Sequence, residues 1–329
     1  MNIMSKIALA VHGGAGTILR SFITADLEAE YRGGLEDALK AGWAILQSGG
    51  PALDAVEAAV VSLEDFPLFN AGRGAVFTHD GKNELDAAIM NGRTLDAGAV
   101  AFVKNVKNPV RLARLVMERT NHILLAGPGA NEFARETGVD LADDDYFFTE
   151  HRYEQLLRAR EDCIVQLDHA AGQPDLADAA GSVIDNTVLL HTSKPIGTVG
   201  AVACDGNGFL AAATSTGGMT NKKFGRVGDT PIIGAGNYAD NVCAVSCTGH
   251  GEYFMIGVTA YDVAARMKYK NLTLEAASRE AIEHLTDIKG EGGLIAVDAN
   301  GNVALPFNSE GMYRGWVTAD GEIRTAIYS

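Results

Sequence analysis

The chain has 329 residues, 47% of them hydrophobic, and carries a formal net charge of −15. This supply of apolar side chains is sufficient for a large buried core. The negative charge argues against a nucleic acid or an anionic membrane surface as a partner, although it does not repel a small zwitterion. No apolar run approaches the ~18 residues that a membrane-spanning helix needs. From the charge and the absence of such a run together, we expect no nucleic-acid partner and no membrane partner.

The cysteines favour a reduced, cytoplasmic protein. They are Cys163, Cys204, Cys243 and Cys247, and no two of them form a CxxC pair. Cys243 and Cys247 lie in an apolar run, which indicates core positions more than a metal site. The apolar patch at residues 7–11 is too short for the hydrophobic region of a signal peptide, which also favours the cytoplasm.

Period-two alternation of Ile7, Leu9 and Val11 predicts a first strand. A glycine-rich segment at residues 12–16 follows it. This segment lacks the third glycine of a dinucleotide-binding fingerprint, because Leu19 occupies that position, and the chain contains no GxSxG nucleophile elbow. We therefore interpret residues 12–16 as a tight backbone turn that lines a pocket.

Helical periodicity and turn residues predict the next elements. In chain order they are helices over 26–47 and from 51 onward, strands over 84–90 and 97–103, a helix over 109–118, a strand over 123–126, and helices over 131–136 and 153–167. The loop at 63–74 mixes glycine, proline and aromatic residues, and is either a well-packed turn or a backbone cage that holds a ligand. Residues 168–196 are mostly small and polar, which is typical of a flexible connector.

The connector ends immediately before a predicted β-hairpin. Two apolar runs flank a turn at 205–208, and Asn207-Gly208 between such runs is a strong hairpin signal. Thr198 begins the first run and Thr216 ends the second. Pairing of the two strands would therefore bring these two hydroxyl groups together.

The remaining elements complete the fold class. Strands are expected over 242–247, 294–298, 303–307, 315–318 and 322–327, and helices over 252–269 and 274–287. The strands come in two batches with helices grouped between them. This order indicates an α+β protein with stacked antiparallel sheets flanked by helices, more than alternating βαβ units.

Thr198 is a candidate nucleophile. A threonine hydroxyl attacks poorly until a base removes its proton. If the chain is cut before Thr198, the new α-amine, with a pKa of about 8, can act as that base. For these residues alone, the alternative is an ordinary strand that begins with Gly197-Thr198.

Arg226 and Asp229 lie three residues apart in a glycine-bracketed loop. A guanidinium can hold a carboxylate with two hydrogen bonds and an aspartate can hold an ammonium, so the pair suits the α-carbon of an amino acid. The alternative is a surface ion pair. Thr248 and Gly249 end a strand in a glycine-rich turn, where a hydroxyl and a backbone N–H can face a developing oxyanion. Here the alternative is a helix cap.

Several segments in this order carry a family resemblance. They are Gly-Thr-Val-Gly-Ala-Val at 197–202, Thr-Ser-Thr-Gly-Gly at 214–218, Gly-Arg-Val-Gly-Asp at 225–229, Gly-Ala-Gly-Asn-Tyr-Ala-Asp-Asn at 234–241 and Thr-Gly-His-Gly-Glu at 248–252. In the first half, His-Gly-Gly-Ala-Gly at 12–16 and Leu-Phe-Asn-Ala-Gly at 68–72 agree with them. Over nearly its whole length the chain resembles the plant-type asparaginases, or isoaspartyl peptidases, of the N-terminal-nucleophile hydrolases.

This resemblance implies a single domain with a four-layer αββα sandwich, cut between Gly197 and Thr198. The products of the cut would be an α subunit, residues 1–197, with a flexible connector over about 168–197, and a β subunit, residues 198–329. The implied reaction is hydrolysis of the side-chain amide of L-asparagine and of β-aspartyl (isoaspartyl) dipeptides through a β-aspartyl ester on Thr198. No catalytic cofactor is implied, and the implied assembly is a homodimer of αβ units.

The resemblance also assigns roles to single residues. Thr198 would be the nucleophile, Thr216 would hold and tune it, and Asn70 would contact it from the first half of the chain. The implied oxyanion hole is Thr248 and Gly249. The residues implied to bind the α-carboxylate and α-ammonium are Arg226, Asp229, Gly249 and Gly251. A structural sodium ion would be bound mainly by the backbone carbonyls of Leu63, Glu64, Phe66, Phe69, Ala71 and Arg73.

Two other functions stay open at this point. Glycosylasparaginase shares the fold and the nucleophile, but it usually has Asp and Asn at the positions where this chain has Gly197 and Gly217. A non-processing amino-acid-binding protein would keep Arg226 and Asp229 but would remain a single chain. A denaturing gel, with one band or two, separates the second alternative from an enzyme that is cut.

Overall fold

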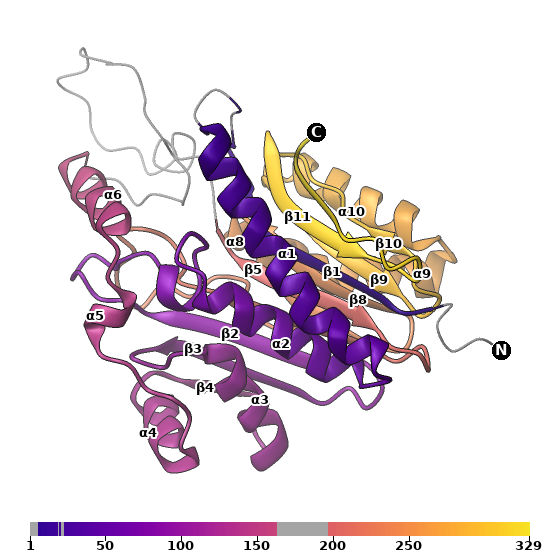
Figure 1. The fold of residues 1–329 in the computed structure, drawn as a ribbon, viewed down its shortest axis with the longest axis horizontal. Helices are drawn as coiled ribbons and strands as arrows, with labels where there is room; N and C mark the ends of the chain where they lie inside the picture. Colours follow the sequence, from indigo (N-terminus) through magenta and orange to yellow (C-terminus); the bar gives the residue numbers. More distant parts are fainter. Residues whose placement is uncertain (1–5, 19, 21–22, 163–196) are drawn as a thin grey trace.

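The computed structural model describes residues 6–18, 20, 23–162 and 197–329 (Figure 1). Its strands are β1 (Ala8–Gly16), β2 (Leu85–Asn91), β3 (Ala97–Val103), β4 (Leu124–Ala126), β5 (Val199–Cys204), β6 (Leu210–Thr216), β7 (Asn237–Ala239), β8 (Cys243–Gly249), β9 (Gly292–Asp298), β10 (Val303–Ala304), β11 (Gly311–Val317) and β12 (Arg324–Tyr328). Its helices are α1 (Ala25–Gln47), α2 (Ala52–Asp65), η3 (Gly72–Gly74), α3 (Pro109–Arg119), α4 (Gly127–Thr137), α5 (Asp144–Phe147), α6 (Glu150–Glu161), α8 (Gly251–Gly257), α9 (Thr259–Lys270) and α10 (Leu274–Asp287). The predicted connector, apart from Gly197, lies outside the described residues.

Two sheets organise these elements. The larger has the strand order β12-β11-β1-β5-β6-β2-β3-β4, and the smaller has the order β10-β9-β8-β7. Strands from the two sides of the 197–198 bond pair directly in the larger sheet, because β1 pairs with β5 and β2 pairs with β6, both antiparallel. The two parts of the chain that a cut at this bond would separate therefore share one sheet.

The predicted hairpin is confirmed. Strands β5 and β6 pair in antiparallel register, with Val199 opposite Ser215. Asp205 stabilises the turn, since its carboxylate accepts the backbone N–H groups of Asn207 at 2.9 Å and of Phe209 at 3.1 Å. The open end of the hairpin brings its two terminal threonines together.

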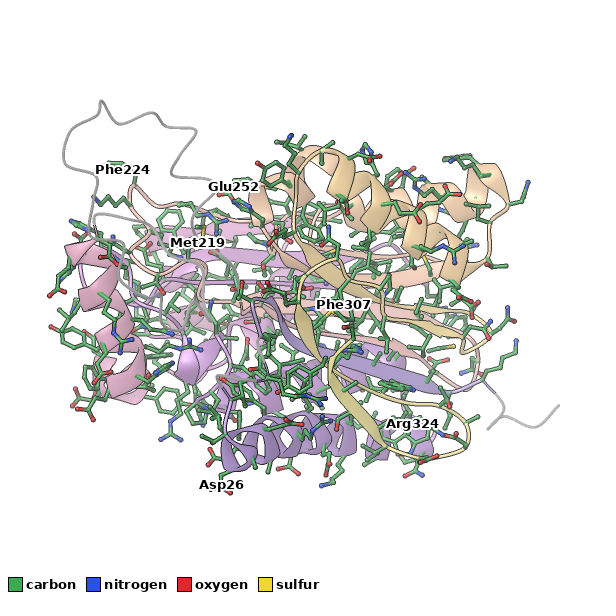
Figure 2. The ribbon with its side chains drawn as sticks, turned by 90° about the horizontal axis from the view of Figure 1, so that it is seen from above. Asp26, Met219, Phe224, Glu252, Phe307 and Arg324 are labelled. Atoms are coloured by element: carbon green, nitrogen blue, oxygen red, sulfur yellow. The ribbon has the colours of Figure 1, made fainter. Side chains whose placement is uncertain are left out.

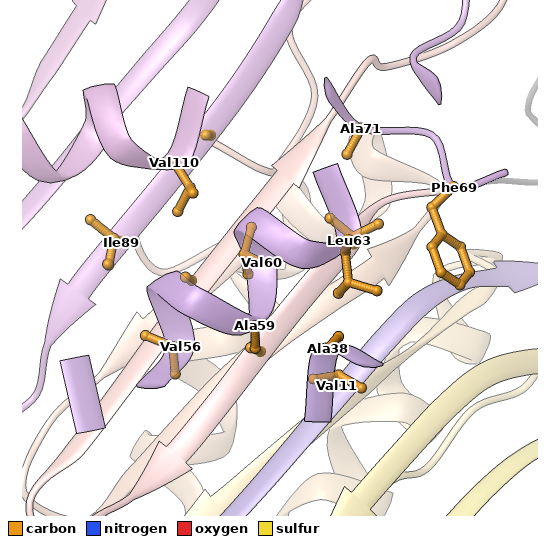
Figure 3. Packing of buried hydrophobic residues seen from close by; sticks show 14 of the residues in the cluster. Val11, Ala38, Val56, Ala59, Val60, Leu63, Phe69, Ala71, Ile89 and Val110 are labelled. Carbon is orange, nitrogen blue, oxygen red and sulfur yellow. The ribbon is translucent and has the colours of Figure 1, made fainter. Parts of the chain in front are cut away.

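In the described part of the chain, buried apolar side chains form three clusters. The first packs α1, α2 and α3 on the larger sheet, and Figure 3 shows Val56, Val60 and Leu63 of α2 in it. The second packs α9 and α10 on the smaller sheet. The third contains small side chains of both sheets, such as Ala10 of β1 and Ala244 of β8, so the sheets can approach closely. None of the helices within the described part of the chain is both long and apolar enough to cross a bilayer.

The alternation predicted for the first strand is confirmed, but the turn predicted after it is wrong. Leu9 belongs to the first cluster and Ala10 to the third, as expected for side chains on opposite faces. Residues 12–16 continue β1, with an irregular register after His12. A Cβ atom on Gly13 would lie 2.2 Å from the ring of Phe69, so glycine at this position permits close packing within a strand.

The single helix predicted over 252–269 is also wrong. Val258 adopts a φ of +47° and separates α8 from α9. A β-branched residue rarely takes this left-handed conformation, so the amino-acid pattern contains no sign of the break. The short elements β7 and α5 were likewise not predicted. Most other predicted helices and strands are present with shifted ends; α6, for example, runs from Glu150 to Glu161 and not from 153 to 167.

A chain of buried polar groups passes between the two sheets and ends at Thr198. His12 Nδ1 lies 2.9 Å from the Thr198 carbonyl oxygen, and His12 Nε2 lies 2.8 Å from Ser246 Oγ. Ser246 Oγ lies 2.8 Å from Thr214 Oγ1, which accepts from Asn237 Nδ2 at 3.1 Å. A carbonyl oxygen only accepts, so the His12 proton is on Nδ1 and Ser246 donates to Nε2. Because Ser246 uses its hydrogen for His12, Thr214 is the donor in its 2.8 Å contact with Ser246, and its longer contact to the Gly236 carbonyl, at 3.4 Å, is the weaker alternative.

His12 is neutral in this arrangement. Burial lowers the pKa of His12 to about 3, although the hydrogen bond to the Thr198 carbonyl opposes the shift. In the unfolded chain a histidine titrates near pH ~6.5. Below that pH the unfolded state binds a proton that the folded state does not, so acidification destabilises the fold.

The variant His12→Asn tests this linkage, because the asparagine amide can replace the Nδ1 donor but does not titrate. Between roughly pH 6.5 and pH 5, the free energy of unfolding of the protein with His12 should fall more steeply than that of the variant, by up to about 1.4 kcal/mol per pH unit. Urea unfolding across this range measures both slopes, with Thr198→Ala in both proteins so that neither can be cut at Thr198. Equal slopes would contradict a neutral, buried His12.

Candidate active site

The open end of the hairpin places two buried hydroxyl groups side by side. Thr198 lies immediately before β5 and Thr216 ends β6, and their Oγ1 atoms are 3.3 Å apart. The two residues are 5% and 3% exposed. Gly197, which precedes the candidate nucleophile, is also buried. The structure thus brings Thr198 and Thr216 into hydrogen-bond contact.

Asn70 reaches this pair through the turn that follows Thr216. The side-chain Nδ2 of Asn70 donates to the Gly218 carbonyl at 2.8 Å, and the main-chain carbonyl of Asn70 accepts the Gly217 N–H at 3.0 Å. The Gly218 N–H donates to Thr216 Oγ1 at 3.0 Å. Asn70 therefore holds the turn that orients Thr216, and its described hydrogen bonds reach Thr198 only indirectly.

Thr248 carries a buried hydroxyl that has no hydrogen-bond partner among the described residues. It lies two residues after Ser246 on β8, so the two side chains leave the same face of the strand. Through His12, Ser246 is already linked to Thr198. A buried, unpaired hydroxyl costs about 1–3 kcal/mol, which a ligand oxygen at this position would relieve. Gly249, the next residue, has no room for a Cβ atom.

Arg226 and Asp229 meet at Gly251. A Cβ atom on Gly251 would lie 2.8 Å from Asp229 Oδ1 and 3.0 Å from Arg226 Nη2. Glycine is therefore required to leave space beside the two charged groups. Three residues that were expected to bind substrate thus lie together in the fold.

Asp229 is a buried carboxyl group with one free oxygen. The residue is 4% exposed, and its Oδ2 has no hydrogen-bond partner in the described part of the chain. Burial raises the pKa of Asp229 to about 7, although the charge of Arg226 opposes the shift. Near neutral pH the group is poised between its two protonation states, and an ammonium group beside it would favour the ionised one.

Glu252, which had no predicted role, holds Arg226. The Arg226 Nε and Nη2 donate to the two carboxylate oxygens of Glu252, both at 2.9 Å. Burial is the largest single influence on Glu252 and opposes its ionisation, but the hydrogen bonds and charge of Arg226, a backbone hydrogen bond and the charge of His250 together lower the pKa of Glu252. Figure 2 shows Glu252 at the same end of the molecule as Met219 and Phe224, which belong to the loop after β6.

The loop after α2, expected to bind sodium, packs its backbone tightly. Gly72 has a φ of +47°, and a Cβ atom there would lie 2.5 Å from the Glu64 carbonyl oxygen. The buried Arg152 donates to the carbonyls of Leu68 at 3.0 Å and Gly74 at 2.9 Å. Backbone carbonyls are hard oxygen ligands of the kind that bind such cations. A loop dense in carbonyls and closed by glycine is therefore compatible with the expected ion.

The Glu64 side chain, in the last turn of α2, connects that helix to β6. Its Oε1 accepts from Ser215 Oγ at 2.6 Å and from the Val110 N–H at 3.1 Å. Burial raises the pKa of Glu64 to about 8, although these hydrogen bonds oppose the shift. The group is mostly protonated at neutral pH. Because Ser215 precedes Thr216, the end of α2, from which the loop continues, is linked directly to the hairpin.

Lys222 and Asp86 also lie close to the site, and no motif pointed to them. Lys222 is 2% exposed, and its Nζ donates to the Glu84 carbonyl at 2.9 Å. Asp86 of β2 lies opposite Thr216 of β6. Burial lowers the pKa of Lys222 and raises that of Asp86, while attraction between the two charges opposes both shifts. Lys222 is followed directly by Lys223, so the amino-acid pattern alone does not single it out.

Comparison with known proteins identifies the family of this chain. A family model described as Asparaginase matches residues 5–327. The chain is similar to the isoaspartyl peptidase of Salmonella typhimurium, with 52% identity over 99% of each chain. It is also similar to the isoaspartyl peptidase of Escherichia coli, with 50% identity over 99% of this chain and 97% of that one. The plant-type L-asparaginase of Pyrococcus abyssi is 46% identical over 93% of this chain and 94% of its own. The family expected from the motifs is thereby confirmed: this chain belongs to the asparaginase family.

Proposed function

We propose that this chain is an isoaspartyl peptidase and L-asparaginase. It hydrolyses the side-chain amide of L-asparagine and the isopeptide bond of β-aspartyl dipeptides. The observation that carries this proposal is the 3.3 Å contact between the buried hydroxyl groups of Thr198 and Thr216. The relatives named isoaspartyl peptidase and plant-type L-asparaginase support the same pair of small-molecule substrates.

The enzyme first cuts itself at the Gly197-Thr198 bond. The Thr198 hydroxyl attacks the carbonyl carbon of Gly197, and the bond from that carbon to the Thr198 nitrogen breaks. The nitrogen gains the proton that the hydroxyl gives up and leaves as a free amine, and water opens the ester left between Gly197 and Thr198 Oγ1. The hydrogen bond from His12 to the Thr198 carbonyl supports this step, because it restrains the residue that must turn its hydroxyl towards Gly197.

Turnover uses the new α-amine as the base. It takes the proton of Thr198 Oγ1, which attacks the side-chain carbonyl carbon of the substrate. The negative charge on the carbonyl oxygen is stabilised by the Thr248 hydroxyl and the Gly249 N–H. As the tetrahedral intermediate collapses, the protonated α-amine gives its proton to the leaving nitrogen, and ammonia or an amino acid departs. Water then hydrolyses the β-aspartyl ester, and Thr216, oriented by Asn70, holds the nucleophile throughout.

The substrate is recognised at its α-carbon. Arg226 binds the α-carboxylate and Asp229 binds the α-ammonium, with the backbone of Gly249 and Gly251 between them. The free Oδ2 of Asp229 and the narrow space beside Gly251 support this assignment, because both suit a compact zwitterion. None of these catalytic steps calls for a cofactor.

The processed protein is one αββα domain of four layers, built from an α subunit, residues 1–197, and a β subunit, residues 198–329. The three apolar clusters support the layers, and the pairing of β1 with β5 supports a fold that survives the cut. We further propose a cytoplasmic homodimer of αβ units. The net charge of −15 supports the absence of nucleic-acid and membrane partners.

A structural sodium ion is proposed for the loop after α2. Its ligands would be mainly the backbone carbonyls of Leu63, Glu64, Phe66, Phe69, Ala71 and Arg73. The ion would supply a fixed positive charge among these carbonyl dipoles and no step of the reaction. The glycine-closed backbone at Gly72 supports this assignment.

The first prediction of the proposed function concerns the nucleophile. Thr198→Ala removes the attacking hydroxyl, so this variant should remain a full-length chain, with hydrolysis reduced on the order of 10³-fold or more. Thr198→Ser keeps a hydroxyl and should still be cut, and hydroxylamine should speed the cut by trapping the ester. Intact-mass spectrometry of the purified proteins distinguishes these outcomes. Two fragments from the alanine variant, with the break at residue 198, would refute the mechanism.

The second prediction concerns pH. With a pKa of about 7, Asp229 is increasingly protonated as the pH falls below 7, whereas the substrate ammonium needs its ionised form. Binding of the product L-aspartate should therefore release protons below pH 7 and weaken by up to about tenfold per pH unit. Calorimetry in buffers of different ionisation enthalpy measures the release. Asp229→Asn should abolish it and weaken binding on the order of 10²-fold or more; unchanged proton release would exclude Asp229 as its source.

A further inference from the structure

Arg226 already has a carboxylate partner inside the protein. Glu252 receives two hydrogen bonds from it, from Nε and from Nη2, each 2.9 Å long. The side chain of Arg226 is 19% exposed and that of Glu252 is 37% exposed, so the pair lies at the edge of the site and is only partly open to solvent. A substrate carboxylate could bind Arg226 only through donors that Glu252 does not already occupy.

A guanidinium group has more than one edge that can bind a carboxylate with two hydrogen bonds. One edge is formed by Nε and one terminal nitrogen, and another by the two terminal nitrogens. Glu252 takes the edge formed by Nε and Nη2. Within the described residues, Arg226 Nη1 has no hydrogen-bond partner, and Nη2 retains a second N–H. Arg226 can therefore bind two carboxylates at once.

The open edge faces space that only glycine leaves free. A Cβ atom on Gly228 would lie 2.8 Å from Arg226 Nη1, and one on Gly251 would lie 3.0 Å from Nη2. The Cβ position on Gly251 is also 2.8 Å from Asp229 Oδ1. The free edge of the Arg226 guanidinium and the Asp229 carboxyl group thus border the same small volume. This volume suits the α-carboxylate and the α-ammonium of one amino acid.

We propose that Glu252 is a positioning residue, which grips one edge of Arg226 so that the Nη1–Nη2 edge is presented to the α-carboxylate of the substrate. This inference rests on the proposed function. Arginine is long and flexible, and an arginine without a second partner must be ordered each time a substrate binds. Glu252 orders it in advance. Because Glu252 acts through Arg226, it contributes to binding the α-carboxylate and not to the steps at Thr198.

The charges around the site are consistent with this role. Arg226 and the buried Lys222 repel each other, and Arg226 lies near the carboxyl groups of Asp86 and Asp229. Glu252 supplies the close negative partner that Arg226 needs before a substrate arrives. The substrate adds one negative and one positive charge, so its binding leaves the net charge of the site unchanged when Asp229 is ionised.

Steady-state kinetics of Glu252→Ala and Glu252→Gln test the proposal. For L-asparagine, Glu252→Ala should raise KM roughly tenfold or more, because charge-assisted hydrogen bonds no longer order Arg226. Glu252→Gln, which keeps one acceptor, should raise KM less. Both variants should be cut at Thr198 and keep kcat within about twofold of the wild-type value. Glu283→Ala is the matched control, since it removes a glutamate from an exposed ion pair on α10 and should change neither constant.

A second substrate separates positioning from a general structural effect. The α-amide of L-asparagine lacks the α-carboxylate, so Glu252→Ala should change kcat/KM for this compound by less than about twofold. An equal loss on both substrates would show that Glu252 is merely structural. A lower KM for L-asparagine would show that Glu252 competes with the substrate, and would overturn the proposal. If the wild-type protein hydrolysed neither L-asparagine nor a β-aspartyl dipeptide, the proposed function itself would fail, and this inference with it.

Discussion

The arrangement of the site depends on the hydrogen bonds and strand pairing that fix Thr198. Its hydroxyl meets Thr216 at 3.3 Å, and its carbonyl accepts from His12 at 2.9 Å. The strand that follows it lies between β1 and β6, inside the larger sheet. A hydroxyl that is fixed in this way can attack a neighbouring carbonyl without first losing its conformational freedom. Because the neighbours come from both sides of the 197–198 bond, the site would remain assembled if that bond were cut, as the proposed function requires.

The site also keeps charges and polar atoms that a stable core would avoid. Thr248 Oγ1 and Asp229 Oδ2 are buried without partners among the described residues, and Lys222 is almost fully buried. Each of these costs folding free energy unless a ligand or a neighbour compensates it. The surrounding glycines keep the space open, since a side chain at Gly251 would fill it. Under the proposed function, these destabilising groups lie where a zwitterionic substrate and an oxyanion would be bound.

Local signals in the amino-acid pattern were sufficient for the hairpin, because Asn207-Gly208 marks the turn within a few residues of both strands. The candidate nucleophile and the Arg226 loop were recognisable as continuous motifs for the same reason. The partners that orient them were not, because His12 is 186 positions from Thr198 and Glu252 is 26 positions from Arg226. Such contacts depend on tertiary packing. The strand through residues 12–16 was missed for a similar cause, since its glycines accommodate a distant ring and make no turn.

The central claim is that Thr198 itself carries the substrate during turnover. Rapid acid quenching of the enzyme with L-asparagine, followed by peptide mapping by mass spectrometry, tests it most directly. The account predicts that the peptide beginning at Thr198 gains the mass of one aspartyl group, and that the modification maps to the Thr198 hydroxyl. Hydrolysis that proceeds with Thr198 unmodified in every quenched sample, or with the aspartyl group on another residue, would contradict the account.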